Sequence, residues 1–355
     1  MPEPLDERGA NAEPIMHRAA RLEDRFHDFR AKRARKRGCV TTVVPYTGYG
    51  APTWVRVLGR VLLAKEPKPG SRAERKYRRR EESIRGWRTF ISVPIADVPV
   101  EVEIEGVLHS VQPDRGGVID TVIPVDLAPG WHTIRMRAAD SSTIAEAPVV
   151  IIPPDQEFGV ISDIDDTVMV TALPRPLLAA WNTFVLDEHA RVPTPGMSVL
   201  LARLEAANPG APIIYLSTGA WNVAPTLTRF LSRNLFPAGP MLLTDWGPTH
   251  DRLFRSGLEH KRTALTRLAL EFPNLRWLLV GDDGQHDESI YGEFVDSHPE
   301  SVRAVAIRQL STSEAVLAGG RSKAERHTAN SGTPWVYAPD GAGLSTQLTD
   351  IGITH

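Results

Sequence analysis

Three carboxylates follow an apolar run in the stretch FGVISDIDDTVMV, residues 158–170. Asp163, Asp165 and Asp166 stand where this run, which is typical of a buried strand, comes to its end. Carboxylates that lose their water without gaining a partner are costly, so a bound cation or a phosphate-handling site would explain them. The alternative is an Asp-rich turn or helix cap after an ordinary strand.

Hydroxyl and ammonium groups follow in the next motifs. IIYLST ends in Ser217 and Thr218, whose hydroxyls can donate hydrogen bonds to a phosphoryl oxygen. Lys261 opens the helix predicted for LEHKRTALTRL, and both an ammonium group and a helix N-terminus attract anions. A helix cap and a surface lysine are the ordinary explanations for these residues.

A second acidic cluster ends the strand predicted in RWLLVGDDGQHDESIY. Asp282, Asp283 and Asp287 offer the oxygen ligands that a hard divalent cation prefers. A tight turn would explain Gly281 and Gly284 but not Asp287. No His/Cys grouping at zinc spacing competes with this site.

The elements that must position these residues lie within 156–310. Apolar strands alternate there with amphipathic helices, which predicts a parallel sheet covered on both faces. Ligands of such sheets bind beyond the carboxyl ends of the strands, so the acidic, hydroxyl and lysine motifs would meet at one edge.

The order of the motifs resembles the haloacid dehalogenase superfamily of aspartate-nucleophile phosphatases. It runs Asp163-x-Asp165-x-Thr167, Ser217, Lys261 and Gly281-Asp282-x-x-x-x-Asp287. The blocks ISDIDDTV, YLSTGAWN and HKRTALTRLALEFPNLRWLLVGDDGQHDESIY are similar to the catalytic domain of the actin-patch phosphatidate phosphatase family, relatives of the lipins. The resemblance covers residues 155–310 and implies a Rossmann-like sheet of the haloacid dehalogenase type. YTGYG and GRVLLA are weaker matches to the domain that precedes this unit in bacterial members.

The resemblance implies a role for each catalytic residue. Asp163 would attack phosphorus and form an aspartyl-phosphate. Asp165 would protonate the leaving oxygen and then take a proton from water. Thr167 would steady the loop, Ser217 would hydrogen-bond a transferring oxygen, and Lys261 would offset the phosphoryl charge.

The resemblance also implies a metal site. Asp282 and Asp287 would hold Mg2+ together with Asp163 and the backbone carbonyl of Asp165. Asp283, where many relatives carry Ser, would be an alternative ligand or lie just behind the site.

Substrate choice stays open between two phosphoesters. Relatives often show Ser-x-Ser-Pro-Trp where this chain has STGAWN, a difference that bears on the substrate. Residues 171–195 are too few for a full lid, and an uncapped site admits large or interface-bound phosphoesters. Their apolar side chains would touch acyl chains or pack on the core. These are Leu177, Leu178, Trp181, Phe184, Val185 and Leu186. The resemblance implies phosphatidate; a soluble phosphoester and a non-catalytic lipid-binding or scaffold module are the alternatives.

The remaining parts of the 355-residue chain predict a second domain and two flanking segments. Residues 1–37 form a disordered start and an amphipathic helix, whose apolar face carries Ile15, Ala19, Leu22, Phe26 and Phe29. Residues 38–155 contain short β-branched segments and predict a β-sandwich-like domain. Residues 311–355 form a linker and a C-terminal packing segment.

Charge and composition limit the classes of binding partner that the sequence predicts. Lys and Arg number 41 against 43 Asp and Glu, a balance that favours no nucleic-acid partner. The basic segments 32–37 and 71–88 would contact an anionic membrane or be solvated loops. With Cys39 as its one cysteine and no apolar run long enough to span a bilayer, the chain is predicted to be cytoplasmic, with at most peripheral membrane contact. The oligomeric state is left open.

Overall fold

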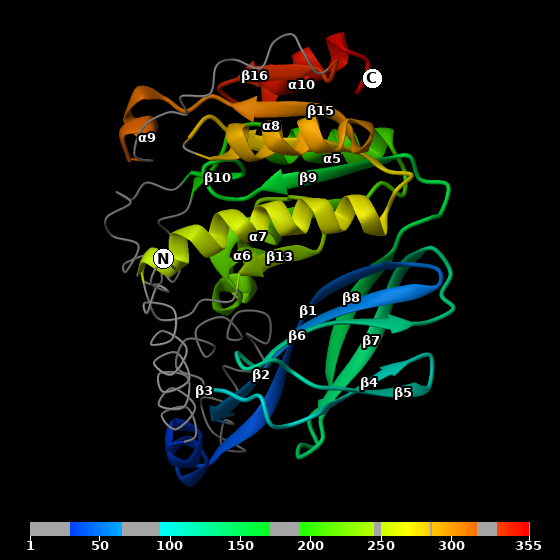
Figure 1. Ribbon diagram of the computed structural model, residues 1–355, viewed down its shortest axis with the longest axis vertical. Helices are drawn as coiled ribbons and strands as arrows, with labels where there is room; N and C mark the ends of the chain where they lie inside the picture. Colours follow the sequence, from blue (N-terminus) through cyan, green and yellow to red (C-terminus); the bar gives the residue numbers. More distant parts are fainter. Residues whose placement is uncertain are drawn as a thin grey trace, which may run out of the picture.

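The computed structural model describes residues 29–65, 93–170, 192–244, 250–284, 286–317 and 332–354. These residues form a mixed α/β structure with a curled N-terminal sheet and a separate six-stranded sheet (Figure 1). Within the described ranges, no helix is long and apolar enough to cross a membrane. The predictions for residues 1–28, for the basic segment 71–88 and for the apolar side chains between 177 and 186 lie outside these ranges.

The N-terminal sheet is built from short, largely alternating strands. They are β1 (Cys39–Ala51), β2 (Trp54–Lys65), β3 (Val93–Pro94), β4 (Val100–Ile104), β5 (Val107–Val111), β6 (Val118–Pro124), β7 (Gly130–Ala138) and β8 (Ala145–Ile151). The order is β3-β2-β1-β8-β7-β4-β5, with β6 also paired to β2. A β-sandwich-like domain was predicted. The strands instead form one curled sheet, because the 12-residue β2 is long enough to pair with β1 along one edge and with both β6 and β3 along the other.

The described end of the N-terminal helix, residues 29–36, differs from the predicted pattern. Phe29, which was placed on the apolar face, is 60% exposed. Ala31 and Ala34 pack against the core of the curled sheet instead. In the described part of the helix, the small side chains and not Phe29 face the sheet. The predicted amphipathic pattern as a whole falls largely on residues outside the described ranges.

The second sheet confirms the predicted parallel arrangement. Its strands are β9 (Phe158–Asp163), β12 (Ile213–Ala220), β13 (Met241–Thr244), β14 (Arg276–Asp282), β15 (Val302–Arg308) and β16 (Trp335–Ala338). Every neighbouring pair in the order β13-β12-β9-β14-β15-β16 is parallel. A short pair, β10 (Met169–Val170) and β11 (Val192–Pro193), follows β9.

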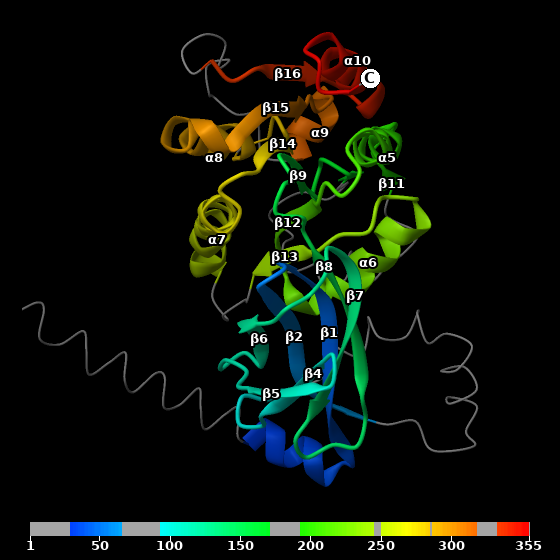
Figure 2. The ribbon, with the colours of Figure 1, turned by 90° about the vertical axis from the view of Figure 1, so that its right-hand side faces the viewer.

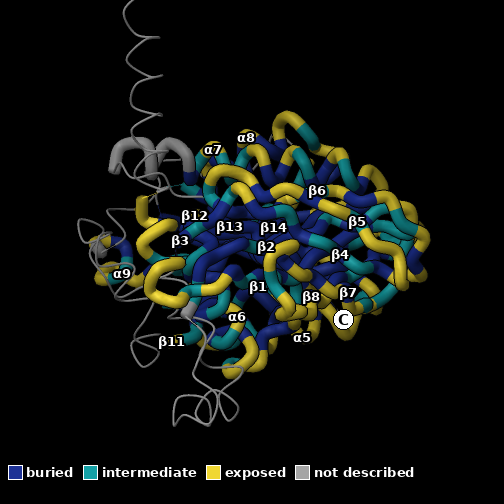
Figure 3. The backbone as a smooth tube through the Cα atoms, turned by 90° about the horizontal axis from the view of Figure 1, so that it is seen from below, coloured by how far each residue is buried: buried dark blue, intermediate teal, exposed yellow. Residues whose placement is uncertain are grey.

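Helices cover both faces of the parallel sheet, which explains why its strands are apolar almost throughout. In Figure 2, α7 (His250–Glu271) and α8 (Asp287–Ser297) lie on one face, and α5 (Met197–Ala207), α6 (Ala224–Arg233) and α10 (Gly341–Asp350) on the other. The strands between them are buried and the outer surfaces of the helices are exposed (Figure 3). Short turns of 3-10 helix, η2 (Trp221–Val223) and η3 (Pro299–Ser301), connect the layers.

The C-terminal residues contribute to this sheet. Within the predicted linker, α9 spans Thr312–Leu317, and β16 then pairs with β15 to extend the sheet by a strand. Leu344 and Leu348 of α10 are completely buried. The C-terminal segment is therefore held by backbone pairing as well as by side-chain packing.

We expect Leu344→Ala to lower the free energy of unfolding by about 2–5 kcal/mol, because it leaves a cavity under α10. Chemical denaturation would measure the change. Thr346→Ala, an exposed position on the same helix, is the control and should change stability by less than about 0.5 kcal/mol. Equal stability of Leu344→Ala and the parent would contradict the packing of α10.

Candidate active site

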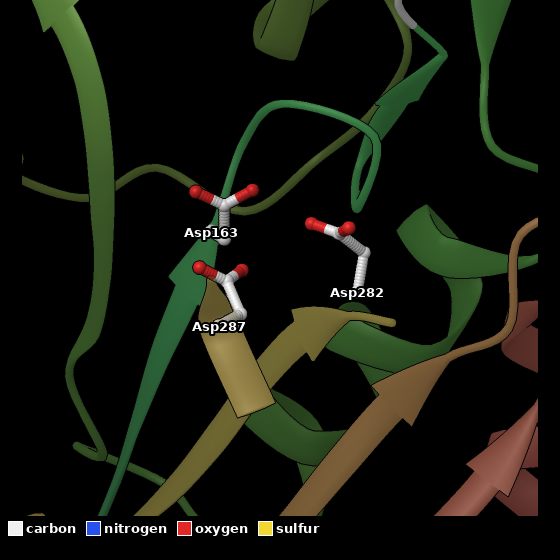
Figure 4. A group of neighbouring side chains, drawn as sticks. All are labelled: Asp163, Asp282 and Asp287. Carbon is white, nitrogen blue, oxygen red and sulfur yellow. The ribbon is translucent and has the colours of Figure 1, made fainter. Parts of the chain in front are cut away.

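The acidic motifs meet at the carboxyl edge of the parallel sheet. Asp163 is the last residue of β9, Asp282 is the last residue of β14, and Asp287 begins α8. Because β9 and β14 are paired in parallel, their ends bring the carboxylates together. One oxygen of each of the three side chains lies within 4.8 Å of the others (Figure 4).

Lys261 links two of these carboxylates. Its Nζ atom lies 2.7 Å from Asp163 Oδ1 and 2.6 Å from Asp287 Oδ1, and all three side chains are at most 7% exposed. Burial disfavours the charged form of Lys261, but Asp163 and Asp287 outweigh this and hold its pKa well above the ordinary value. Lys261 lies in the middle of α7, so the prediction that it opens a helix was wrong. It reaches the site as a buried point charge without help from a helix N-terminus.

The three carboxylates carry more negative charge than Lys261 can balance. Burial raises the pKa of Asp163 and of Asp282 well above the ordinary value, and Asp287 adds to both shifts. Asp163 Oδ2 and Asp287 Oδ2 are buried and have no hydrogen-bond partner among the described residues. A divalent cation with oxygen ligands would supply both the missing charge and the missing contacts, so these residues fit Mg2+.

Asp165 lies beside this acidic trio and binds a different group. Its Oδ2 accepts a hydrogen bond of 2.8 Å from Ser217 Oγ, and Ser217 Oγ accepts one of 2.9 Å from Gly219 N. The described residues that could hold a cation by their side chains are Asp163, Asp282 and Asp287, without Asp165. Thr218, the local alternative to Ser217, is the exposed residue near the C-terminal end of β12.

The loop after Asp163 is steadied by its backbone. Val168 N and Met169 N donate to Ile164 O at 3.1 and 3.0 Å, and Asp166 N donates to Met169 O at 2.8 Å. Asp166 has a left-handed φ of 58°. Thr167 is completely buried, and its Oγ1 has no partner in the described part of the chain. The predicted role of Thr167 is therefore not carried by a hydroxyl hydrogen bond to a described residue.

Arg308 is a site residue that the sequence reasoning missed. At the end of β15, its Nη1 donates to Asp166 O at 2.7 Å and its Nη2 contacts Glu314 Oε1 at 2.6 Å. The side chain is 5% exposed. The available signal was a charged residue at the end of the apolar strand VRAVAIR, where water is scarce. Arg308 thus ties the loop that carries Asp165 to β15, which lies beyond β14 in the sheet.

The structure explains why Asp283 and Gly281 occupy their positions beside the site. Asp283 Oδ1 accepts a hydrogen bond of 2.7 Å from Leu310 N, which joins β14 to the segment after β15. A Cβ atom on Gly281 would lie 2.8 Å from Asp287 Oδ2 and 2.7 Å from Tyr291 Cε2. Gly281 therefore leaves room for the Asp287 carboxylate, which relates it to the site and not only to a turn.

Comparison with known proteins finds a family that matches the segment containing the site. Residues 158–309 match the family described as the catalytic domain of phosphatidate phosphatase APP1. This segment, somewhat less than half of the chain, is similar to that family. Phosphatidate phosphatase APP1 of Saccharomyces cerevisiae is 27% identical over 158 residues, which are 44% of this chain and 26% of the yeast protein.

Other similarities are weaker or less informative. An uncharacterized protein of Schizosaccharomyces pombe is 24% identical over 63% of this chain and 36% of its own length. The chain thus spans about a third or less of the length of these two relatives. A carbohydrate acetylesterase from Xanthomonas citri aligns at 11% identity over 79% of this chain and 73% of its own, with a TM-score of 0.27, too low to compare the folds.

For the phosphatase activity proposed below, we expect Gly281→Ala to lower the rate about a hundredfold, because the added methyl group displaces the Asp287 carboxylate. Initial rates of phosphate release from the folded variant would measure this. Gly159→Ala is the control, since its Cβ would crowd Trp277 at the opposite end of β9 and should reduce stability more than activity. Similar losses of activity in both variants would contradict the explanation.

Proposed function

We propose that this chain is a Mg2+-dependent phosphatidate phosphatase that releases diacylglycerol and phosphate through an aspartyl-phosphate on Asp163. The observation that carries the proposal is the buried trio Asp163, Asp282 and Asp287 within the segment that matches the family. Lys261 joins two of its members, Asp163 and Asp287. A Rossmann-like sheet of the haloacid dehalogenase type is supported by the strand order. Numbered along the chain, the order is 3-2-1-4-5-6, as in doubly wound nucleotide-binding sheets.

The chain's own residues would hold the metal. Asp163, Asp282 and Asp287 would bind Mg2+ together with the backbone carbonyl of Asp165, as an oxygen set of the kind that Mg2+ prefers. When bound, Mg2+ supplies positive charge that offsets the charge on the phosphoryl oxygens. Lys261 adds a positive charge between Asp163 and Asp287, and its hydrogen bond to Asp163 Oδ1 keeps that carboxylate oriented.

The reaction would proceed in two displacements at phosphorus. The Asp163 carboxylate forms an O–P bond while the bond from phosphorus to the ester oxygen breaks, and the leaving oxygen takes a proton from Asp165. Ionised Asp165 then takes a proton from water, whose oxygen attacks phosphorus and releases phosphate from Asp163. Ser217 holds the Asp165 side chain through its hydrogen bond to Oδ2 during both proton transfers.

Phosphatidate is the proposed substrate because the yeast relative bears the name phosphatidate phosphatase. A soluble phosphoester is the alternative. A non-catalytic lipid-binding or scaffold module would be expected to lose site residues, whereas Asp163, Asp165, Ser217, Lys261 and the acidic partners are all in place. Cytoplasmic location and peripheral membrane contact stay predictions; the described basic residues of 32–37 are exposed.

We expect Asp163→Asn to lower phosphate release by about a thousandfold or more, because the variant lacks the nucleophilic oxygen. Asp155→Asn, which makes the same substitution at an exposed position outside the site, should retain activity. Both would be assayed beside the parent on phosphatidate in mixed micelles and on soluble phosphomonoesters. Activity on micelles alone favours the lipid substrate, and equal rates in parent and Asp163→Asn would refute the assignment of the nucleophile.

We expect Mg2+ to raise the melting temperature of the parent, because an ion that binds only the folded state stabilises it by about 2.7 kcal/mol at a hundred times its Kd. Asp282→Asn should reduce this shift, whereas Asp155→Asn should keep it. Thermal unfolding with and without MgCl2 measures the effect without relying on activity. A shift of the same size in Asp282→Asn would show that the ion binds elsewhere.

A further inference from the structure

The motif YTGYG, residues 46–50, lies in the N-terminal sheet and has no part in the chemistry proposed so far. Residues three apart in a regular strand point to opposite faces. The pairing of β1 with β2 shifts register between Tyr46 and Tyr49, and such a bulge re-aims side chains. Both tyrosines consequently enter the buried core that contains the parallel sheet.

A glycine permits the close pairing at this bulge. A Cβ atom on Gly48 would lie 2.5 Å from the backbone oxygen of Arg56 and 2.9 Å from Val149. The sequence Tyr-Thr-Gly-Tyr therefore allows one strand to direct two aromatic rings toward the second sheet.

Tyr46 contacts the loop that follows the Ser217 strand. Its ring stacks on Trp221 with centroids 4.6 Å apart and planes inclined by 14°, and its hydroxyl donates to Trp221 O at 3.0 Å. Both side chains are 5% exposed. Trp221 begins η2 directly after β12, so the contact fixes the chain shortly beyond Ser217.

The residues between Ser217 and Trp221 transmit this contact to the site. Gly219 N donates to Ser217 Oγ, which in turn donates to Asp165 Oδ2. From the neighbouring strand, Thr244 Oγ1 approaches the carbonyl oxygens of Thr218 and Gly219 at 3.0 and 3.1 Å. The end of β12 is thus held by Thr244 of β13, and Trp221 directly after it is held by Tyr46 of the N-terminal sheet. Figure 2 shows the N-terminal sheet lying next to β12 and β13.

Tyr49 makes a matched contact at a different place. Its hydroxyl donates to Glu271 Oε2 at 2.8 Å, and Arg56 Nη2 lies 2.6 Å from Glu271 Oε1. Glu271 is the last residue of α7, well over two helical turns beyond Lys261. The same motif therefore supplies a second buried tyrosine at the same interface. The contacts of Tyr49 do not involve the segment from Ser217 to Trp221.

We propose that Tyr46 is a positioning residue. Through it, the N-terminal β-rich unit fixes η2, which begins at Trp221, and so holds Ser217 against Asp165. The effect on catalysis rests on the proposed function, whereas the effect on the loop does not. The proposal assigns the N-terminal sheet a part in the active site without giving it any contact with the substrate.

Two measurements on the full chain test the proposal. Hydrogen–deuterium exchange should show faster exchange across residues 217–223 in Tyr46→Leu, because the ring stack and the hydroxyl hydrogen bond are both lost. Tyr46→Phe keeps the ring and should show a smaller increase. Tyr49→Leu, the matched control, should leave exchange across 217–223 as in the parent and increase it near the end of α7.

Phosphatidate hydrolysis is the second readout, measured at a temperature where each variant is folded. We expect kcat to fall about tenfold or more in Tyr46→Leu with KM within about twofold, because a small displacement of positioned groups lowers rate without removing substrate contacts. Tyr46→Phe should recover most of the rate, and Tyr49→Leu should have the parent kcat.

Each remaining outcome overturns a distinct statement. Unchanged exchange across 217–223 in Tyr46→Leu refutes the positioning role, and Tyr46→Phe decides the matter in the same way if Tyr46→Leu does not fold. Faster exchange with an unchanged kcat, or with a change in KM alone, refutes the link to catalysis. If the parent has no Asp163-dependent activity, the proposed function fails, while the exchange measurements still decide whether Tyr46 fixes the loop.

Discussion

The burial of several like charges in one place is the constraint on which this structure depends. Asp163 and Asp287 lose most of their contact with water, and Lys261 repays part of that cost by lying between them. Removing a single partner from such a cluster leaves a buried charge without compensation. The surrounding strands and helices must therefore hold these side chains within narrow limits, and a cation would complete the balance in the proposed function.

The parallel sheet meets this requirement through its topology. Strands β9 and β14 are adjacent although more than a hundred residues separate them in the chain, and α8 begins immediately beyond β14. The supporting contacts come from still other elements. Arg308 holds the carbonyl of Asp166 from β15, and Thr244 holds the loop after Ser217 from β13. Residues that hold the backbone in place, such as Arg308 and Thr244, thus surround the residues that are proposed to act on the phosphoester.

The two sheets share buried surface and are not independent modules joined by a linker. The side chains of Tyr46 and Tyr49 extend from the curled sheet at its bulge into the core that contains the parallel sheet. Arg56 and Glu271 add an ion pair across the same contact. Such a contact couples the stability of the N-terminal sheet to that of the parallel sheet, because separation would expose aromatic surface and leave buried polar groups unpaired.

The parallel sheet, the order of the acidic, hydroxyl and lysine motifs, and the residue types suited to a cation could be predicted from the sequence, because hydrophobic periodicity and the residues at strand ends can be read within single segments. Tertiary structure decided which of them meet. Asp165 pairs with Ser217 and stays outside the acidic trio, Lys261 comes from the middle of a helix, and Arg308 joins the site. These pairings are long-range contacts. Side chains far apart in the chain come within hydrogen-bonding distance of one another only after the strands have paired, so the sequence could not predict which of them would meet.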